Sequence, residues 1–599
     1  MYDPTPRLRD YRFVLHETLK IHEETAIEGY DALDEDTTAA ILTEGARIAR
    51  YVLAPLNQPG DRQGCRLENG VVRTPDGYPE AWGVLCEGGW PGLECDPEFG
   101  GQGVPSLMGL AVGTLKSAAN MAFMMYHGLS HGAYCALHAH GTEEQRRIYL
   151  PPLVSGAWTG TMNLTEPQCG TDLGLIRSRA EPGEDGSWRI TGQKIWISSG
   201  EHDLAENIVH LVLARLPEAP AGTKGLSLFV VPKFLPNPDG TLGARNRLAC
   251  IGLEHKMGIH GNATCVMDYD GATGWLVGEP HKGLRAMFTM MNDARLLVGM
   301  QGLAVAMAAQ GRAADFARDR LQGRAVTGAA EPEKPADPII VHPDVRRMLM
   351  EQKAFVEGAM AFLSWAALLL DAEKRHADPG ERARAGDMVA LLTPVVKAFL
   401  TEEGVRITQS AQQVLGGAGY VEDTGLAQYL RDVRITTVYE GTTGVQALDL
   451  VGRKLAMNGG APIRAFFDYV KGYIRENDDD LALARDFLEP LKSASKDLQQ
   501  AAMYFLQAGM KNPNAALAGA TDFLFLFGHV CMGLSWTRMA KTARRAIEAG
   551  AEGAERDYYE AKITTGRFYM KRLLPETKLR LARIETGAEP VMDLPAAAF

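Results

Sequence analysis

The sequence predicts a mainly helical protein with a small β domain in its middle and a further helical block at its end. Three observations lead to this fold class. Apolar residues recur at helical spacing in the first part of the chain and again from about residue 284 onward. Short runs rich in β-branched and aromatic residues, separated by Gly, Pro, Asn and Asp, lie between them. The chain also lacks the strand–helix alternation that a parallel sheet requires, which argues against a doubly wound fold.

Residues 1–157 are expected to form the first helical domain. The segment RDYRFVLHETLKIHEE has apolar residues at helical spacing. The segment SLMGLAVGTLKSAANMAFMMYHGLSHGAYCALHAHG is apolar on nearly all sides and rich in small residues, which predicts a buried pair of helices. Thr142 is a suitable N-cap for the helix that starts in GTEEQRRIYL.

Residues 158–283 are expected to form a small antiparallel β domain. The runs SWRITGQKIWISSG, NIVHLVLARL, GLSLFVVPKF and TCVMDYDGATGWLVG are typical of short strands. Helices return over residues 284–458, interrupted by the loop TGAAEPEKPADP, whose Pro-rich and charged composition predicts exposure. A fourth domain, also helical, is expected over residues 459–599.

The most apolar stretch, TDFLFLFGHVCMGLSW, lies in this last domain. It is short and contains His529, and no run of the sequence reaches the length of a membrane span, so we expect a buried helix here.

Composition limits the class of protein. The 599 residues carry a formal net charge of −12, which argues against nucleic-acid binding, because such binding relies on Lys and Arg facing phosphates. The eight cysteines are scattered and form no CxxC pair, so reduced thiols in a cytoplasmic protein are expected. The N-terminal segment MYDPTPRLRDYRF has no apolar core of a signal peptide.

Three short motifs are candidates for a functional site, and each also has an ordinary structural explanation. The run MNLTEPQCGTDLG, residues 162–174, either presents backbone N–H groups to a ligand or is a polar turn. In GQKIWISSG, Trp196 alternates with Ile195 and Ile197 and either stacks on a flat ring system or fills the core. QQVLGGAGYVED lies at the end of a helix, and its ordinary structural explanation is a glycine C-cap. Its GGAG does not follow a strand, so it is not a dinucleotide-binding fingerprint.

The histidines His131, His138 and His140 raise the question of a metal site. Their spacing matches no usual zinc pattern, and no acid or cysteine set accompanies them in the sequence. Structural or surface histidines, and no metal, are therefore expected.

Taken together, five motifs carry a more specific resemblance. LTEPQCGTDLG, GQKIWISSG, MNDARLLVGMQG, QQVLGGAGY and RDVRITTVYEGTTGVQ occur in the order and spacing of the acyl-CoA dehydrogenase family, over residues 40–455. The resemblance implies that family's fold: a helical domain, a β-barrel domain and a helical bundle, here with a C-terminal helical extension. The opening YDPTPRLRDYRFVLHE, the segment GRAVTGAAEPEKPADPIIVHPDVRRML and the last helical block are similar to the 3-methylmercaptopropionyl-CoA dehydrogenases of dimethylsulfoniopropionate breakdown.

The resemblance assigns a catalytic role to Glu440 in the YEGT stretch. In the family this acid removes the α-proton of an acyl-CoA thioester, and flavin N5 accepts the β-hydrogen as hydride. Apolar surroundings are expected to raise the pKa of the carboxyl group and make it a better base. The backbone N–H of Glu440 and a ribityl hydroxyl of the flavin would stabilise charge on the thioester oxygen. Some relatives carry the base just before the arginine of DxR; here that residue is Ala294, which cannot act as a base.

The resemblance also implies FAD and a shared cofactor site. Residues at flavin-lining positions are Met162, Leu164, Thr165, Trp196 and Ser198. Other positions contact the rest of FAD, in part the FAD of a neighbouring subunit. The residues there are Arg320, Gln413, Gly416, Gly417 and Thr442. A homodimer or higher homo-oligomer is therefore expected. Positions near the acyl-CoA substrate are Thr171, Arg295, Tyr439 and Gly441.

The sequence departs from the family pattern at three places. Gly323 and Arg324 follow Gln322 where the family has FG, Gly444 replaces a common glutamine, and QCGT replaces GAGS. The first two departures concern FAD contacts, and the third concerns the shape of the acyl-CoA loop.

The function that the resemblance implies is oxidation of a short acyl-CoA to the trans-2-enoyl-CoA, with 3-methylmercaptopropionyl-CoA giving methylthioacryloyl-CoA as the favoured substrate. Electrons would leave to an electron-transfer flavoprotein, and neither a nucleic acid nor a membrane is an expected partner. The alternatives are a straight-chain short- or medium-chain enzyme, an acyl-CoA oxidase and a DNA-binding relative.

Overall fold

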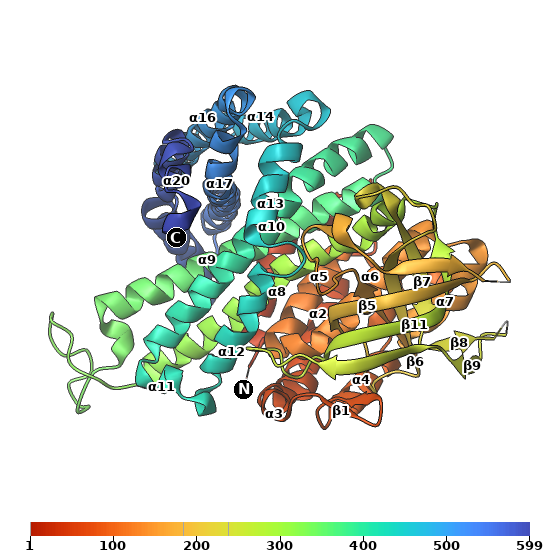
Figure 1. Ribbon diagram of the computed structural model, residues 1–599. Coiled ribbons are helices and arrows are strands. Elements are labelled where there is room, and N and C mark those ends of the chain that lie inside the picture. The colour runs from red at the N-terminus through yellow and green to blue at the C-terminus, as the bar shows by residue number, and fades with distance from the viewer. Residues whose placement is uncertain (1, 184, 238) are drawn as a thin grey trace. The chain divides into compact units, whose positions relative to one another are not determined.

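The computed structural model describes residues 2–183, 185–237 and 239–599 (Figure 1). The chain forms two compact units. The first comprises residues 45–297, and the second comprises residues 2–44 and 298–599. The division falls inside helices α2 (Glu35–Ile48) and α8 (Gly283–Asp319).

The helices of the first unit are α3 (Ala54–Gln63), α4 (Tyr78–Glu87), α5 (Ser106–Ala119), α6 (Met121–His140) and α7 (Glu143–Ser155). Helices α6 and α7 pack against strand β3 (Trp158–Asn163) of its sheet. Nearly all of α5 and much of α6 are buried, which confirms the predicted buried helix pair. Asn120 starts α6 by accepting a hydrogen bond from the Phe123 N–H at 3.0 Å. Thr142 starts α7 in a capping box with Gln145, as its sequence predicts.

The β domain is a seven-stranded sheet in which five strands close into a ring. The strands are β3 (Trp158–Asn163), β4 (Arg179–Pro182), β5 (Trp188–Ser198), β6 (Asn207–Arg215), β7 (Leu226–Pro232), β10 (Leu248–Leu253) and β11 (Thr264–Val277). The order is β10-β11-β5-β4-β6-β3, and β7 pairs with both β11 and β6, which closes the barrel. Two small hairpins flank it, β1 (Arg66–Glu68) with β2 (Val71–Arg73), and β8 (Phe234–Pro236) with β9 (Leu242–Arg245).

The expectation of an antiparallel domain is wrong for β6, which pairs in parallel with β3 and, at Arg215 opposite Arg179, with β4. Strand β3 pairs with β6 in parallel along its whole length, from Trp158 opposite Asn207 to Asn163 opposite Val212. Between β3 and β6 the chain forms β4 and β5, which pair with each other as antiparallel strands. It then forms β6 beside β3, in the same direction. Hydrophobic patterning gives no strand direction, so the sequence could not distinguish the two arrangements.

Strand β6 separates two hydrophobic clusters. Val209, Leu211 and Leu213 pack into the cluster that also contains apolar residues of α6, α7 and the start of α8. Val212 and Ala214 point into the other cluster, formed by the facing strands. Both faces of β6 are therefore covered, which explains its nearly continuous apolar sequence.

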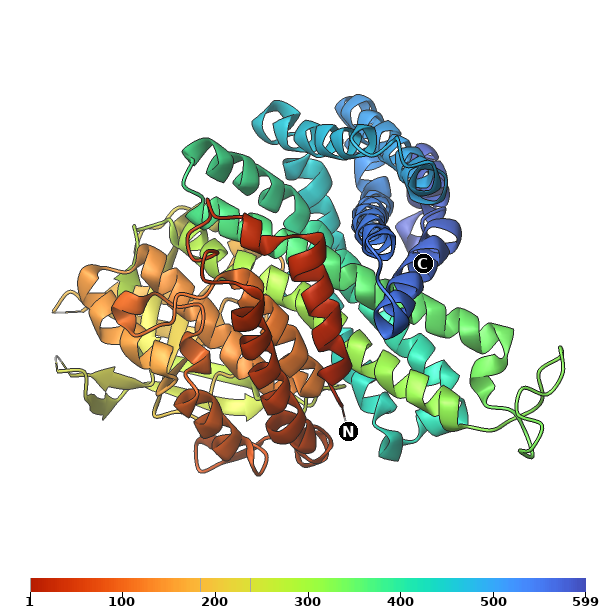
Figure 2. The same cartoon turned by 180° about the vertical axis from the view of Figure 1, so that it is seen from behind.

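The second unit is helical. Its helices are α1 (Thr5–Arg12), α9 (Pro343–Arg375), α10 (Pro379–Val414), α11 (Gly417–Tyr420), α12 (Leu426–Val433), α13 (Thr443–Asp449), α14 (Ala461–Arg475), α15 (Leu481–Leu483), α16 (Glu489–Lys511), α17 (Pro513–Glu548), α18 (Gly553–Phe568), α19 (Glu576–Glu585) and α20 (Glu589–Met592). The long helices α9 and α10 pack side by side. The loop TGAAEPEKPADP is largely exposed, as predicted, and stands away from these helices in Figures 1 and 2.

Helix α17 is the centre of the C-terminal extension. It packs against α16, α18 and α19 and also against α9 and α10. Trp536 Nε1 donates to the Ala354 carbonyl of α9 at 3.1 Å, and Gly528 lies directly against the Phe399 ring of α10. The blue helices of Figures 1 and 2 are this extension, and they share one compact unit with the bundle.

Among the described residues, two helices, α9 and α17, are long and apolar enough by length and composition to cross a membrane. The statement from sequence that no run reaches this length is therefore wrong. The packing of the same helices agrees with core helices, because 89% of the apolar window in α9 and 72% of that in α17 are buried inside the protein. Residues such as Phe523, Phe527 and Val530 are fully buried, which confirms the predicted buried helix.

Candidate functional site

The loop after β3, which carries LTEPQCGTDLG, is fixed to β5 by a buried ion pair. Lys194 Nζ lies 2.8 Å from Glu166 Oε1 and donates to the Leu164 carbonyl at 3.0 Å. Glu166 also accepts from the backbone N–H groups of Arg177 at 2.7 Å and Ser178 at 3.0 Å. These contacts hold both ends of the loop and set the positions of the backbone around Leu164 and Thr165.

The ion pair is strongly perturbed by its surroundings. Burial opposes the charge on Glu166, but Lys194 and the hydrogen bonds outweigh it and lower the pKa of Glu166 to about 2. Burial lowers the pKa of Lys194 although Glu166 acts in the opposite direction. The sequence analysis missed this pair. Each partner lies inside a quoted motif, TEP or GQK, but nothing in the sequence links them.

The residues around Trp196 and those around Met162 lie side by side. The Ile195 N–H donates to the Thr165 carbonyl at 3.0 Å, and Thr161 Oγ1 donates to the Ser198 carbonyl at 2.7 Å. These two contacts join the end of β3 and its loop to the end of β5. The predicted flavin-lining set of the first unit is thus one contiguous patch: Met162, Leu164, Thr165, Trp196 and Ser198.

Trp196 departs from the regular alternation expected from the sequence. Its φ is 58°, and the register between β5 and β11 shifts at this point, which marks a β-bulge. The bulge turns the indole outward, and Trp196 is 61% exposed although Ile197 beside it is buried. A large apolar ring exposed at the end of a buried strand fits a planar ligand better than a core position. The first unit therefore fits a flavin at this patch.

The two predicted substrate positions of the first unit differ in exposure. Thr171 is exposed in the loop after β3. Arg295 is only 6% exposed on α8, and its guanidinium carbon lies 5.9 Å from the centroid of the Phe288 ring.

In the second unit, Glu440 sits in an unusual turn between the 3₁₀ turn Arg434–Thr437 and α13. Glu440 has a φ of 55° and Gly441 a φ of 90°, so two successive residues adopt left-handed backbone conformations. Lys397 Nζ donates to the Gly441 carbonyl at 2.6 Å, and Gln446 Nε2 donates to the Glu440 carbonyl at 3.0 Å. Both donors are fully buried, so the backbone that carries Glu440 is rigidly held.

The residues on either side of Glu440 are also fixed. Tyr439 donates its hydroxyl to Gln301 of α8, and burial raises the pKa of Tyr439 far above its ordinary value. Thr442 is the N-cap of α13 and accepts from the Val445 N–H at 3.3 Å. The sequence analysis did not identify Lys397 or Gln446. A signal was present for Lys397, because it is the one charged residue in the apolar run LLTPVVKAFL.

The remaining predicted cofactor positions of the second unit lie on its surface. Gln413, Gly416 and Gly417 are exposed at the end of α10, and a Cβ atom added at either glycine would meet nothing within 4 Å. Tyr420 nearby is 83% exposed. Arg320 is exposed just beyond the end of α8. An open surface of this kind fits a cofactor or a second chain.

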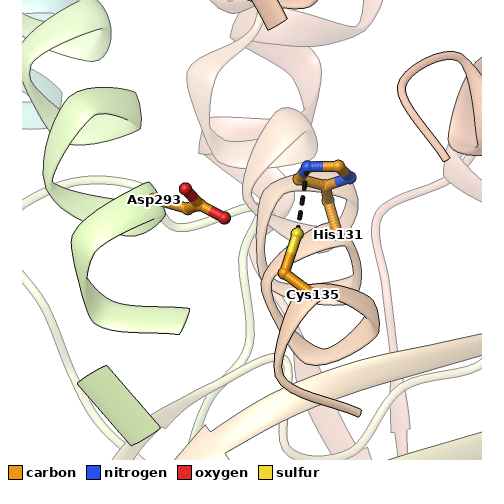
Figure 3. Close-up of side chains that lie close together, drawn as sticks. All are labelled: His131, Cys135 and Asp293. Carbon is orange, nitrogen blue, oxygen red and sulfur yellow. Dashed lines mark hydrogen bonds between the residues drawn. The ribbon is translucent and has the colours of Figure 1, made fainter. Parts of the chain in front are cut away.

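The three histidines have partners that the sequence analysis did not find. His138 Nε2 lies 3.4 Å from an Asp96 carboxylate oxygen, and His140 Nε2 lies 2.7 Å from Thr289 Oγ1. His131 is accompanied by Cys135 and Asp293 (Figure 3), so the expectation that no acid or cysteine joins the histidines is wrong. Burial opposes protonation of His131, but the Glu94 carboxylate and the Cys95 thiol outweigh it and raise the pKa of His131 to about 9.

Family models match consecutive segments of the chain from residue 66 to residue 595. The matches are to the acyl-CoA dehydrogenase N-terminal domain over residues 66–157, its middle domain over 161–272 and its C-terminal domain over 281–455. A fourth model, described as acetyl-CoA dehydrogenase C-terminal like, matches residues 461–595.

Named relatives and a solved structure agree with these matches. The chain is 42% identical to a 3-methylmercaptopropionyl-CoA dehydrogenase of Ruegeria pomeroyi, over 97% of this chain and 98% of that protein. It is 35% identical to a broad-specificity linear acyl-CoA dehydrogenase of Mycobacterium tuberculosis, over 99% of each. The fold is similar to that of an acyl-CoA dehydrogenase from Bacillus anthracis solved with FAD, with a TM-score of 0.74 at 19% identity over 94% of this chain and 90% of that one. The chain therefore belongs to the acyl-CoA dehydrogenase family and is an FAD-dependent enzyme that dehydrogenates an acyl-CoA thioester.

Proposed function

We propose that the chain converts 3-methylmercaptopropionyl-CoA to methylthioacryloyl-CoA. The observation that carries this substrate is the 42% identity, over nearly the full length of both proteins, to a relative named for it. The similarity extends through the C-terminal extension, which shorter family members would not match. The reaction removes one proton from the α-carbon and one hydride from the β-carbon, and leaves a trans double bond between them.

Glu440 is the base in this proposal, and its task is to take the α-proton onto its carboxylate. The side chain is half-buried, and its backbone is held by Lys397 and Gln446. A base held in one position avoids the entropic cost of finding the proton in the transition state. Ala294 at the alternative position has no group that accepts a proton.

Negative charge that develops on the thioester oxygen needs a hydrogen-bond donor. The backbone N–H of Glu440 is our candidate, because the left-handed turn fixes its direction before substrate arrives. Tyr439 and Gly441 flank this N–H, and Thr171 and Arg295 are the proposed substrate contacts in the first unit.

FAD, when bound, supplies the acceptor for the hydride. The residues proposed to hold its ring system are Met162, Leu164, Thr165, Trp196 and Ser198, and those proposed to hold its remaining parts are Arg320, Gln413, Gly416, Gly417 and Thr442. Trp196 offers an exposed aromatic face, and the backbone around Leu164 and Thr165 is fixed by Lys194 and Glu166.

We further propose that electrons leave to an electron-transfer flavoprotein and that the protein is located in the cytoplasm. We also propose that it is at least a homodimer, because the FAD site is shared. The same ten cofactor positions and four substrate positions, together with the predicted domain limits at 157, 283 and 458, remain predictions that site-directed and truncation experiments can test.

A straight-chain short- or medium-chain substrate is the second candidate. It is favoured by the 35% identity to a relative named for linear acyl-CoA thioesters, which also spans the full chain. An oxidase would produce peroxide in air, and a DNA-binding protein would shift DNA at physiological salt. The net charge of −12 disfavours the latter.

Anaerobic flavin bleaching distinguishes the substrate candidates. The purified flavoprotein is mixed with 3-methylmercaptopropionyl-CoA, butyryl-CoA or octanoyl-CoA, and the rate of flavin reduction is followed for each. We expect the sulfur-containing thioester to reduce the flavin fastest. Faster reduction by a straight-chain thioester would discard the sulfur substrate and keep the dehydrogenase chemistry.

A further inference from the structure

A cluster of metal-ligating side chains lies in the first unit, apart from the residues assigned above. His131 and Cys135 are one helical turn apart on α6 and therefore share a face of that helix. His131 Nε2 and Cys135 Sγ are 3.5 Å apart. Asp293 of α8 directs its carboxylate toward this pair, and one ligand atom from each of the three residues lies within 4.8 Å of the other two (Figure 3).

A fourth donor approaches the same imidazole nitrogen. Glu94 Oε2 lies 4.0 Å from His131 Nε2. The donors are thus one nitrogen, one sulfur and two carboxylates, from three separate segments of the first unit. Zn²⁺ takes this mixture of nitrogen, sulfur and oxygen ligands in four-coordinate sites.

The direction of the donors favours a metal over a nucleophilic cysteine. A thiol–imidazole–carboxylate relay needs the acid at the imidazole nitrogen opposite the thiol. Here Cys135 and Glu94 both approach Nε2, so Cys135 lacks that arrangement. The thiol of Cys95 faces Nδ1 at 4.0 Å and so lies opposite Glu94, but Cys95 is only 1% exposed, which closes its thiol to a substrate. Because the Cys135 thiol and the Glu94 carboxylate lie at the same nitrogen of His131, these three residues form a set of metal ligands and not a catalytic relay.

The charge and exposure of the cluster also suit a cation. Two carboxylates, Glu94 and Asp293, lie beside the imidazole, and carboxylate oxygens are ligands that Zn²⁺ accepts. His131, Cys135 and Asp293 are all half-buried, so an ion has access from solvent but loses part of its hydration.

We propose that His131, Cys135 and Asp293, with Glu94 as the fourth ligand, bind one Zn²⁺ ion that links α6 to the first turns of α8. The ligand atoms of His131, Cys135 and Asp293, which lie within 4.8 Å of one another, would close around the ion, and Glu94 would approach from its place 4.0 Å from His131 Nε2. The site does not depend on which acyl-CoA is the substrate. Asp293 is two residues from Arg295, so the ion would hold in place the part of α8 that carries that arginine.

Cobalt substitution tests the site in the FAD-loaded protein. The protein is treated with a chelator, dialysed and titrated with Co²⁺, whose tetrahedral d–d bands lie at longer wavelengths than flavin absorption. We expect one Co²⁺ per chain, a thiolate-to-metal charge-transfer band, and displacement of both signals by Zn²⁺. Asp293→Asn should weaken binding by about 10–100-fold, and Cys135→Ser should remove the charge-transfer band.

Matched variants separate this site from other thiols and imidazoles. Cys86→Ser changes another half-buried cysteine and His138→Gln another histidine of α6, and both should bind Co²⁺ as the unaltered chain does. Thermal melting gives a second measurement, because Zn²⁺ should raise the Tm of the unaltered chain and not that of Asp293→Asn.

Two outcomes would overturn the proposal. One is the absence of tetrahedral Co²⁺ bands together with no Zn²⁺ effect on Tm. The other is binding that survives unchanged in both Cys135→Ser and Asp293→Asn. If Cys135→Ser does not fold, Asp293→Asn decides alone, since it keeps the shape of the side chain and removes only its charge.

Discussion

At the scale of single residues, the turn at Glu440 shows how the fold holds the backbone of the proposed base. A left-handed backbone at a non-glycine residue is uncommon and costs free energy, so surrounding contacts must support it. Lys397 and Gln446 provide that support through the Gly441 and Glu440 carbonyls. Neither side chain needs to touch substrate to affect the rate, and we regard both as positioning residues.

Replacing Lys397 tests this role. Lys397→Met keeps an unbranched side chain, one atom shorter, and removes the donor to the Gly441 carbonyl. We expect the limiting rate of flavin reduction to fall about 10–100-fold, because small displacements of a catalytic group are costly. Substrate affinity and FAD content should be retained, and Lys397→Arg should restore part of the rate. A rate within twofold of the unaltered enzyme in Lys397→Met would refute the positioning role.

The ion pair of Glu166 and Lys194 predicts a pH-dependent stability. Glu166→Gln would leave Lys194 buried without its counter-charge, which should cost about 3–5 kcal/mol at neutral pH and lower the Tm. The folded-state pKa of Glu166, about 2, lies below its ordinary value of 4.5, so the stabilisation is complete above pH 4.5 and is lost as pH falls toward 2. Thermal melts of Glu166→Gln and of the unaltered chain at several pH values measure the difference in Tm.

A matched variant supplies the control for that series. Glu181→Gln removes an exposed carboxylate that pairs with Arg179 on the same β domain. Its Tm should stay close to that of the unaltered chain at every pH, because exposed pairs contribute little. If Glu166→Gln melted like Glu181→Gln at neutral pH, the buried pair would not hold the loop.

At the scale of helices and strands, α17 depends on a glycine for its close approach to α10. A Cβ atom at Gly528 would lie 2.3 Å from ring atoms of Phe399, so even alanine forces a shift. We expect Gly528→Ala to destabilise the protein by about 1–3 kcal/mol and to lower its Tm.

Gly472 in α14 is the matched control. A Cβ atom there meets nothing within 4 Å, so Gly472→Ala should stabilise its helix by up to about 1 kcal/mol. The two alanine variants should thus move the Tm in opposite directions, as differential scanning calorimetry can measure. Equal effects would mean that the spacing of α17 and α10 is not set by Gly528.

The elements differ in how far the sequence predicts them. Helices with caps and long apolar faces, such as α6 and α7, follow from local patterns, and so does the exposure of the loop before α9. The parallel pairing of β3 with β6 and the bulge at Trp196 do not, because both depend on partners distant in sequence.

The residues of the candidate site also differ in how far the sequence predicts them. The YEGT motif predicts Glu440 as the base from consecutive residues, through the family resemblance. Lys194 with Glu166, Lys397 with Gly441, and Cys135 with Asp293 are pairs that only folding brings together. The apolar pattern of the chain places them in helices and strands but gives no information on which side chains meet.

At the scale of the whole molecule, the open surface at the end of α10 predicts association. Gln413, Gly416 and Gly417 are exposed together with Tyr420, and the family resemblance directs them to the cofactor of a second chain. We expect sedimentation to give at least twice the mass of one chain. Gly417→Arg should reduce both association and FAD content, and a fully active monomer would contradict a shared site.

The most direct test of the account is the reaction of Glu440→Gln with its proposed substrate. The variant is loaded with FAD and mixed anaerobically with 3-methylmercaptopropionyl-CoA, and flavin reduction is followed in parallel with Glu381→Gln, which alters an exposed acid at the start of α10. The account predicts a rate at least about 10²–10⁴-fold lower for Glu440→Gln and an unchanged rate for Glu381→Gln. Near-normal flavin reduction by Glu440→Gln would contradict it.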